Sequence, residues 1–463
     1  MKILIRNGTV VTPNETVETD LLLAEGRIIA LGHALSTDGA VMVDASGRYV
    51  LPGGVDIHTH IIFDIDATGP DTYFAGTMPA ACGGTTTIVD HMAFMPEGRA
   101  LEQHIAAHRA LAENKAAVDY GFHAVMQNRD EASLQRLKSL PEQGYTSIKA
   151  YMTYDNRLDD EALFKLLRRT NELDMLCAVH AENHDITTLL RAECKAKGLG
   201  EPKWHAKSCP AHTEAEAVSR VLHLAAMADD ATVYIAHVSS ALGLAEIRKA
   251  RAQGQKNIFV ETCTQYLTLT EERYCDKEKG LNYIMSPPLR TQADVDALWQ
   301  GLINGEIQTI ATDHCSFTTA DKARGRGDFT RCPGGAPGIE ERFSLLFSEG
   351  VAKGRLSLNA FATLIAANPA KLTGLYPKKG ALVPGSDADF IILDPGFNPA
   401  TEYTLSASDL HGPSDYSVYE GFKLTGRIEA VYLRGSCIVH NSTYLGKPGD
   451  GQFMQRGRNM FPG

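Results

Sequence analysis

Eight short runs of apolar and β-branched residues alternate with longer helical stretches along the middle of this chain. In the helical stretches, such as residues 160–174 and 215–228, apolar residues recur at spacings of three and four. Such an alternation favours parallel strands with helices packed outside them, and eight units close into an α/β (β/α)8 TIM barrel. The predicted strands are residues 55–63, 85–92, 118–126, 146–152, 175–182, 232–239, 257–263 and 308–315.

Two segments of different character bracket this alternation. Residues 1–52 and the region after 377 consist of short apolar strands broken by Gly, Pro and Asp, with turn pairs such as Asn7-Gly8. The residues after about 440 carry Gly, Pro and Arg and are typical of an extended arm. We therefore predict a first β-segment at 1–52, a catalytic barrel at 53–377, a second β-segment at 378–440 and an arm at 441–463.

The net charge limits which partners the protein can bind, and the cysteine content indicates its cellular compartment. The 56 acidic and 45 basic side chains give a net charge of −11, which opposes binding to nucleic acid or to anionic membranes. The longest uncharged stretch, residues 72–89, is rich in Thr, Gly and Pro and fails as a membrane span. Nine scattered cysteines, an odd number without a C-x-x-C pair, favour a reducing compartment. We expect a cytoplasmic protein without a secretory signal, since Arg6 soon interrupts the first apolar run.

Histidines follow the predicted strands at the end where a barrel carries its chemistry. His58 and His60 lie two residues apart on the first strand, so both side chains point into the barrel mouth. An isolated H-x-H pair is weak evidence, because histidine also has structural roles at strand ends. His180, His237 and Asp313 end three further apolar strands. Neutral imidazoles with a carboxylate are the usual ligands of Zn²⁺ and related divalent ions, so we predict a metal site.

Lys149 closes the fourth predicted strand in the same layer. A lone lysine would normally extend to solvent. A cationic ammonium beside two divalent ions would be repelled, however, so this amine must be neutral or chemically changed. A neutral amine can add carbon dioxide, and the resulting carbamate (N6-carboxylysine) has two oxygens that can bridge two metal ions. Four imidazoles, this carbamate and Asp313 would suffice for a two-metal centre.

The motifs around these residues resemble the amidohydrolase superfamily, and within it the hydantoinase and dihydropyrimidinase group of cyclic amidases. The resemblance covers nearly the whole chain and is carried by several motifs in the same order, including LPGGVDIHTH (51–60), SIKAYM (147–152), VHAEN (179–183), ATDHCSF (311–317) and PGGAPGIEERF (333–343). It implies a homotetrameric barrel enzyme whose bracketing β-segments fold together as a small sandwich. It also implies a binuclear zinc centre bridged by carboxylated lysine.

Site roles follow from the resemblance position by position. The family's metal ligands correspond to His58, His60, Lys149, His180, His237 and Asp313. The resemblance makes Asp313 catalytic as well, and Tyr154 matches the tyrosine that donates a hydrogen bond to the scissile carbonyl. Ser286 matches a residue whose backbone holds the cyclic amide, although a turn before Pro287 explains it nearly as well. Gly334 stands where relatives carry a substrate-contacting asparagine, so only its backbone groups can serve here.

The resemblance implies a small cyclic amide as the substrate. We predict hydrolysis of 5-monosubstituted hydantoins, D-selective and tolerant of aryl groups, to N-carbamoyl amino acids. The loop after Tyr154 is shorter than in many hydantoinases and leaves room, and Phe63, Phe94 and Tyr151 could form apolar walls. Dihydropyrimidines are the first alternative substrates and allantoin the second. A non-catalytic scaffold homologue is the alternative of another class, although the six ligand positions oppose it, and a mononuclear deaminase would lack the bridging lysine.

Overall fold

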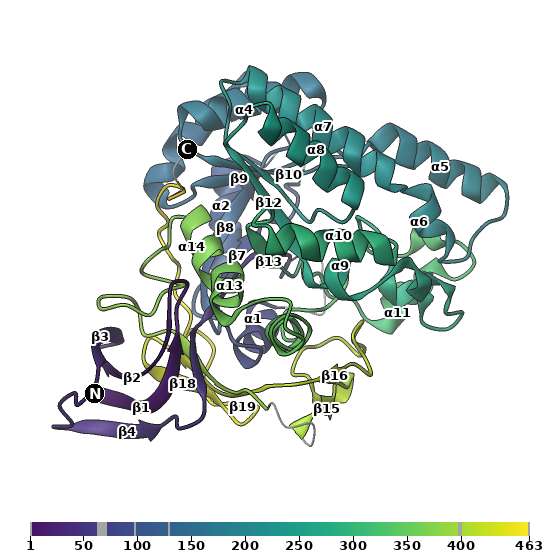
Figure 1. The fold of residues 1–463 in the computed structure, drawn as a ribbon. Helices are drawn as coiled ribbons and strands as arrows, with labels where there is room; N and C mark the ends of the chain where they lie inside the picture. Colours follow the sequence, from purple (N-terminus) through teal and green to yellow (C-terminus); the bar gives the residue numbers. More distant parts are fainter. Residues whose placement is uncertain (1, 63–71, 97–98, 128–129, 397–400, 462–463) are drawn as a thin grey trace.

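The computed structural model describes residues 2–62, 72–96, 99–127, 130–396 and 401–461. Eight strands pair in sequence order to form one parallel sheet (Figure 1). The sheet closes between its first and last strands, where Thr59 bridges His314 and the Asp313 amide donates to the His58 carbonyl at 2.9 Å. The strands are β6 (Gly54–Thr59), β7 (Thr85–His91), β8 (Asp119–Val125), β9 (Ser147–Tyr151), β10 (Leu176–His180), β11 (Val233–Ile235), β12 (Ile258–Cys263) and β13 (Thr309–Ala311). The predicted (β/α)8 barrel is confirmed.

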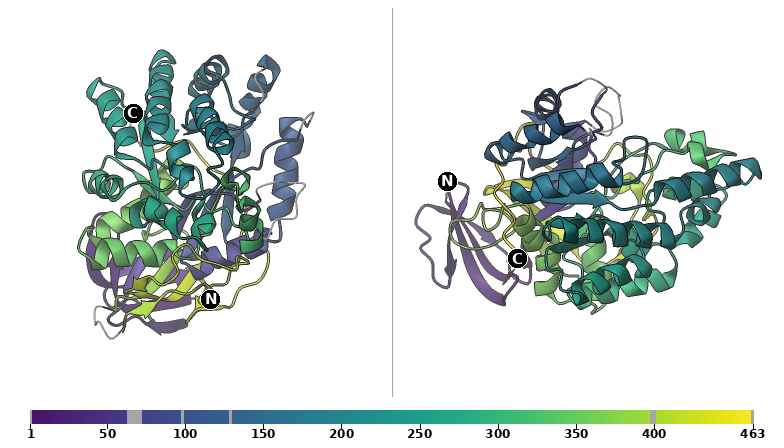
Figure 2. Two further views of the ribbon diagram at one scale, coloured as in Figure 1. Left: turned by 90° about the vertical axis from the view of Figure 1, so that its right-hand side faces the viewer. Right: turned by 90° about the horizontal axis from the view of Figure 1, so that it is seen from above.

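Helices surround the barrel and contribute apolar side chains to a shared core. In α4 (Asp160–Glu172), Leu163, Leu166 and Leu167 are buried on one face, and the Asp159 side chain caps the first turn. Figure 2 shows the helices standing around the strands. The other α-helices are α1 (Tyr73–Cys82), α2 (Leu101–Ala112), α3 (Glu131–Arg136), α5 (His184–Ala196), α6 (Trp204–Ser208), α7 (Ala211–Met227), α8 (Ala241–Ala252), α9 (Thr264–Thr268), α10 (Gln292–Ile303), α11 (Thr319–Lys322), α12 (Arg342–Leu346), α13 (Leu358–Ala362) and α14 (Asn368–Leu372).

The two bracketing β-segments form one mixed sheet of nine strands beside the barrel. Its chain halves meet where β5 pairs antiparallel with β14, so the expectation that the N- and C-terminal segments fold together is confirmed. Phe390 and Tyr432, whose ring centroids lie 4.4 Å apart, stack in its apolar core. The strands are β1 (Lys2–Val11), β2 (Thr16–Ala24), β3 (Arg27–Gly32), β4 (Ala40–Asp44), β5 (Tyr49–Pro52), β14 (Phe390–Asp394), β17 (Arg427–Leu433), β18 (Ser436–His440) and β19 (Thr443–Tyr444). A separate ribbon pairs β15 (Tyr403–Thr404) with β16 (Lys423–Leu424).

The sheet joins the barrel through a short covalent link and a buried charge cluster. Gly53 separates β5 from β6, and a Cβ there would collide with the Thr86 side chain. The buried Lys379 ammonium contacts Asp119 on β8 and the Asp389 carboxylate at 2.6 Å. The C-terminal segment lies along β8, with the Tyr120 amide donating to the Gln452 carbonyl at 2.9 Å. The four domain limits given above stay a prediction.

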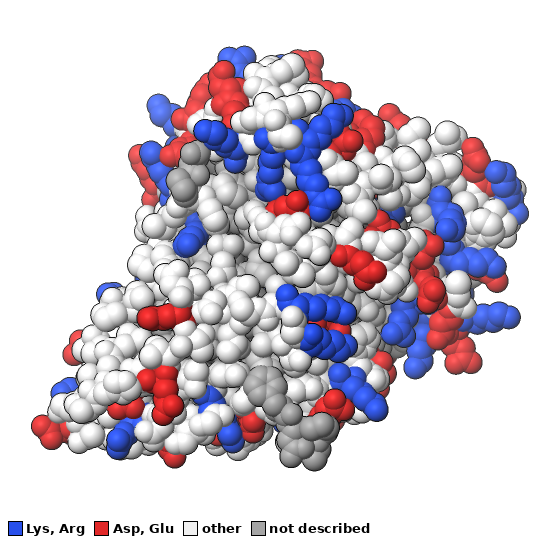
Figure 3. All heavy atoms as spheres, in the orientation of Figure 1, with Lys and Arg blue, Asp and Glu red and all other residues white. Residues whose placement is uncertain are grey.

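Charge is dispersed over the face of the molecule in Figure 3, where acidic and basic side chains intermingle. None of the nine cysteines forms a disulfide. Across the described ranges, no helix combines the length and the apolar character needed to cross a bilayer.

Candidate metal centre

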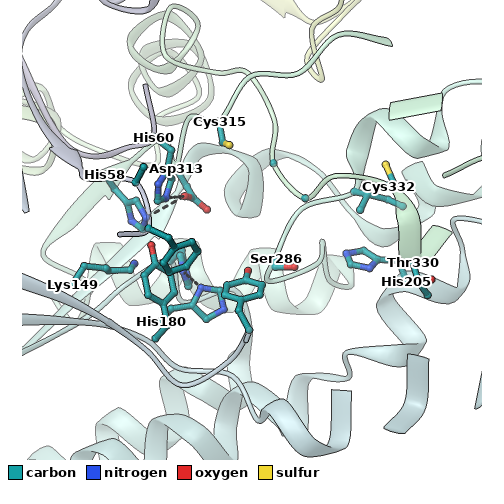
Figure 4. Close-up of a pocket in the computed structure, with 18 of the residues that line it drawn as sticks. His58, His60, Lys149, His180, His205, Ser286, Asp313, Cys315, Thr330 and Cys332 are labelled. Atoms are coloured by element: carbon teal, nitrogen blue, oxygen red, sulfur yellow. Dashed lines mark hydrogen bonds and ion pairs between the residues drawn. The ribbon is translucent and has the colours of Figure 1, made fainter. Parts of the chain in front are cut away.

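The structure brings all six predicted ligands to one cavity of about 190 Å³ at the carboxyl ends of the barrel strands (Figure 4). His58 lies on β6 and His60 directly follows it, while Lys149 lies on β9 and His180 ends β10. His237 and Asp313 lie two residues beyond the last residues of β11 and β13. Residues far apart in the sequence thus meet because parallel strands end at the same edge of the barrel.

Three of the six form one donor group. The Oδ1 atom of Asp313 lies 3.1 Å from His58 Nε2 and 3.2 Å from His60 Nε2. Burial favours the neutral form of His60 and lowers its pKa. Burial likewise opposes charge on Asp313, but the His58 and His60 rings outweigh it and hold the pKa of the carboxyl well below its usual range. The group therefore offers a carboxylate and two imidazoles to one point in space.

A second donor group faces the first. His180 Nδ1 and His237 Nε2 lie 2.9 Å apart, and burial lowers the pKa of both rings, so both stay neutral near pH 7. Lys149 is fully buried between β8 and β10, and its side chain reaches toward the cavity (Figure 4). Burial lowers the pKa of its ammonium to about 8, against the attraction of Asp313 and Glu261.

Three of the donor atoms, from His58, His60 and Asp313, lie close enough together to hold one metal ion. Lys149 Nζ is buried and has no hydrogen-bond partner among the described residues. Buried polar atoms without partners are costly, and a coordinated ion would satisfy them. Imidazole and carboxylate are also the ligand types that zinc takes in open catalytic sites. The donor set is therefore that of a metal centre.

A buried carboxylate behind the ligands orients one of them. Glu261 Oε1 lies 2.6 Å from His58 Nδ1 and accepts the His237 amide at 2.8 Å. Tyr234 donates its hydroxyl to Glu261 Oε2 at 2.5 Å. Burial opposes charging of His58, but Glu261 and Asp313 raise the pKa of its ring to about 9. We did not predict a role for Glu261 from the sequence. Its position inside an otherwise apolar strand could have indicated one.

Three predicted site residues adopt left-handed backbone conformations. The φ angles are 39° at His237, 51° at Asp313 and 72° at Tyr154. For residues with bulky side chains these conformations are unfavourable, and they concentrate at functional sites. The strain turns the chain at the strand ends so that these side chains face the cavity.

The predicted substrate residues lie around the same cavity. Tyr154, Ser286 and Gly334 line it, and burial raises the pKa of the Tyr154 hydroxyl, so this group remains a hydrogen-bond donor. A Cβ at Gly334 would meet only Ser286 Oγ, at 3.8 Å, which shows that the two loops face each other closely.

One wall of the cavity is aromatic, as expected. Phe94 and Tyr151 line it with ring centroids 4.9 Å apart, whereas Phe63 lies outside the described residues. Three further lining residues, Arg191, His205 and Phe329, come from segments that sequence reasoning left unassigned. No periodicity or motif marks them, because they reach the cavity from helices and loops outside the strands.

A further histidine adjoins the centre on β7. The ring centroid of His91 lies 4.3 Å from that of His58 and 4.5 Å from that of His123 on β8. Burial lowers the pKa of His91 well below its usual value, and neither of its ring nitrogens has a hydrogen-bond partner among the described residues. Its closeness to His58 places it beside the predicted ligands.

Comparisons with known proteins agree with this geometry. Residues 49–438 match the amidohydrolase family. The chain is 45% identical to a D-phenylhydantoinase of Escherichia coli O1:K1 over 98% of both sequences. It superposes on the dihydropyrimidinase of Brevibacillus agri with a TM-score of 0.96, 40% identity and complete coverage of both chains. An L-hydantoinase from Arthrobacter aurescens shares the fold with a TM-score of 0.88 and 29% identity, over 97% of this chain and 99% of the other. The chain therefore belongs to the amidohydrolase family and is a cyclic amidohydrolase of the hydantoinase and dihydropyrimidinase type.

Proposed function

We propose that this enzyme opens 5-monosubstituted hydantoins, with a preference for D-aryl rings, to give N-carbamoyl amino acids. Two donor groups and a buried amine in one cavity support the proposal. The first group is His58, His60 and Asp313, and the second is His180 and His237. The amine is that of Lys149, which is fully buried. The similarity to D-phenylhydantoinases over 98% of the chain supports the choice of ring.

Two divalent ions, most simply Zn²⁺, would be held by these five side chains and by a carbamate on Lys149. When bound, such a pair supplies hydroxide at neutral pH and polarises the scissile carbonyl. The carbamate would replace an ammonium that burial already disfavours by an anion between the two donor groups.

The protein's own groups would direct the reaction. Asp313 would accept the proton of the attacking water and pass it to the ring nitrogen as the carbon–nitrogen bond breaks. The protonated Tyr154 hydroxyl would donate a hydrogen bond to the carbonyl oxygen as that oxygen gains charge. The backbone groups of Ser286 and Gly334 would hold the ring amide between them. Phe94 and Tyr151 would receive an aryl substituent.

Dihydropyrimidines are the second candidate substrates, because the Brevibacillus agri structure that this chain matches with a TM-score of 0.96 is that of a dihydropyrimidinase. Allantoin ranks third, since no observation in the cavity favours it. The L-hydantoinase from Arthrobacter aurescens has the same fold at a TM-score of 0.88, so stereochemistry must depend on side chains around the cavity and not on the barrel.

The deciding experiment compares kcat/KM of zinc-loaded enzyme on D-phenylhydantoin, L-phenylhydantoin and dihydrouracil, because this ratio reports differential transition-state binding. A large preference for the D-aryl ring is the expected result. A preference for dihydrouracil would assign the enzyme to dihydropyrimidine hydrolysis instead. Inactivity on all three substrates, with about two metal ions bound per chain, would refute the proposed substrate ring. The proposed metal centre would still be supported.

We also propose a homotetramer in the cytoplasm. The resemblance to the family supports the tetramer, and the absence of disulfides among nine cysteines supports a reducing compartment. Light scattering coupled to size exclusion should give four times the chain mass of 50.3 kDa.

A further inference from the structure

A lysine outside the metal centre is buried without a carboxylate partner. Lys322 ends the short helix α11 and is 0% exposed. None of the described carboxylates lies within ion-pair distance of its Nζ, and the side chain of its neighbour Asp321 is engaged by Thr318 and Arg324 instead. The ring of Phe317 lies 5.3 Å from Nζ. Burying such a charge raises the free energy of the folded state unless the N–H groups of the ammonium find hydrogen-bond acceptors.

The Lys322 ammonium donates three hydrogen bonds, all of them to backbone carbonyls. Nζ donates to the carbonyls of Ile284 at 2.8 Å, Pro333 at 2.8 Å and Gly335 at 2.5 Å. An ammonium has three N–H groups, so its hydrogen-bonding capacity is complete. The cation therefore holds together two backbone segments that are about 50 residues apart in the sequence.

These two segments carry the proposed substrate contacts. Ile284 lies two residues before Ser286, and Pro333 and Gly335 flank Gly334 on either side. The Gly335 amide also donates to the Ile284 carbonyl at 3.1 Å. Figure 4 shows Ser286 and Cys332 on these loops, on the opposite side of the cavity from Lys149.

The second loop is fixed against the strand end that carries Asp313. The Cys315 amide donates to the Ala336 carbonyl at 3.1 Å, and a Cβ on Gly335, whose φ is 144°, would lie 2.8 Å from the Cβ of Cys315. Gly335 thus has no space to shift toward β13. The distance between the loops is consequently set on the side of Lys322, where three carbonyl dipoles converge and would repel one another without a cation.

We propose that Lys322 is a positioning residue that sets the spacing between the Ser286 and Gly334 loops, and thereby the fit of the cyclic amide between them. The inference rests on the proposed function, because it assigns the ring to these two backbones. It requires no contact between Lys322 and the substrate, so the residue acts through the loops and is separate from the metal ligands.

The test replaces the ammonium by an apolar group of similar length, Lys322→Met. We expect KM for D-phenylhydantoin to rise on the order of tenfold or more, with kcat within about threefold of the parent and unchanged metal content. Hydrogen exchange provides a readout that needs no substrate: the peptide containing the Gly335 amide should lose protection, whereas peptides of β14 should not. Lys322→Gln, which keeps two donors and is neutral, should give intermediate values and serves if the methionine variant does not fold.

Phe390→Leu, a packing change in the mixed sheet, is the control for stability loss alone. At a comparable decrease in melting temperature it should leave KM unchanged. The proposal is overturned if Lys322→Met retains the Gly335 protection, if KM stays at the parent value despite lost protection, or if metal content and kcat fall while KM does not change. Inactivity of the parent enzyme on every cyclic amide would refute the proposed function, and with it the role in substrate fit, while the exchange data would still show whether Lys322 holds the loops.

Discussion

Glu261 Oε1 lies 2.6 Å from Nδ1 of His58, so the ring of this histidine is held with its other nitrogen, Nε2, directed toward Asp313. Both side chains are completely buried. A carboxylate in this position fixes the ring orientation and makes the imidazole a stronger donor to a metal ion. The relationship shows that the candidate centre includes residues behind the ligands.

Replacing Glu261 by Gln removes the charge but keeps an oxygen that can accept the His58 hydrogen bond. We expect metal affinity to fall by about 10- to 100-fold, the usual effect of losing such a partner. Titration with a metal chelator that buffers free zinc measures this directly. Glu246→Gln, at a partly exposed position on α8 where Glu246 pairs with Lys249, should leave the affinity unchanged. Equal affinity in the Glu261 variant and the parent would contradict a role in the centre.

Lys149→Ala tests the proposed carbamate. Without the amine no carbamate can form, so metal content and activity should be lost together, with kcat/KM lower by at least about three orders of magnitude. Short carboxylic acids such as acetate or propionate should partly restore both, because they supply the missing anion. Metal analysis and kinetics with and without the acid are the measurements. Full activity of the variant would rule out the bridging lysine.

Tyr154→Phe tests the hydrogen bond to the developing oxyanion. Loss of one such donor lowers kcat by about 10²- to 10³-fold, and KM should change far less, because the bond is stronger in the transition state. Metal content should stay that of the parent enzyme. Tyr444→Phe, in the mixed sheet, is the matched control and should keep parent kinetics. A Tyr154 variant with raised KM and normal kcat would make this residue a binding group only.

The polar side chains at the strand ends could be predicted because each follows or ends an apolar run that itself predicts a strand. Each of His58, His180 and Asp313 lies at or just beyond the carboxyl end of a strand whose apolar run is visible in the sequence. Barrel closure then brings them together without further information. The exact strand ends differ from the prediction: β11 has three residues where eight were predicted, because His237 adopts a left-handed conformation that ends the pairing.

Residues that depend on loop conformation could not be predicted in this way. Lys322 and Arg191 lie on helices between strands, and their roles follow from which backbone or cavity they meet in space. The accessory strands were recognised from turn residues, but their order, with β5 between β1 and β14, reflects long-range pairing that no local pattern encodes. The sequence therefore allowed a better prediction of which side chains meet at the strand ends than of which loop and helix residues line the cavity.

Glu341 provides a prediction about stability that is independent of the metal. The side chain is 3% exposed and accepts the Ser417 hydroxyl at 2.7 Å. Burial, with a smaller contribution from Glu340, raises the pKa of its carboxyl from 4.5 to about 6. The folded protein therefore binds a proton more tightly than the unfolded chain does, and stability must fall as the pH rises through the interval between these two values. The difference corresponds to about 2 kcal/mol above pH 7.

Glu341→Gln removes this titration. At pH 8 the variant should be more stable than the parent by up to about 2 kcal/mol, because the parent must keep a buried carboxylate charged. At pH 4.5 the parent carboxyl is protonated in the folded state, so the gain should vanish. Urea unfolding at both pH values measures the effect. The neighbouring Glu340→Gln should instead lose stability, since Glu340 accepts a hydrogen bond from His411 at 2.6 Å. A gain of equal size at both pH values would show that the benefit comes from packing and not from the buried charge.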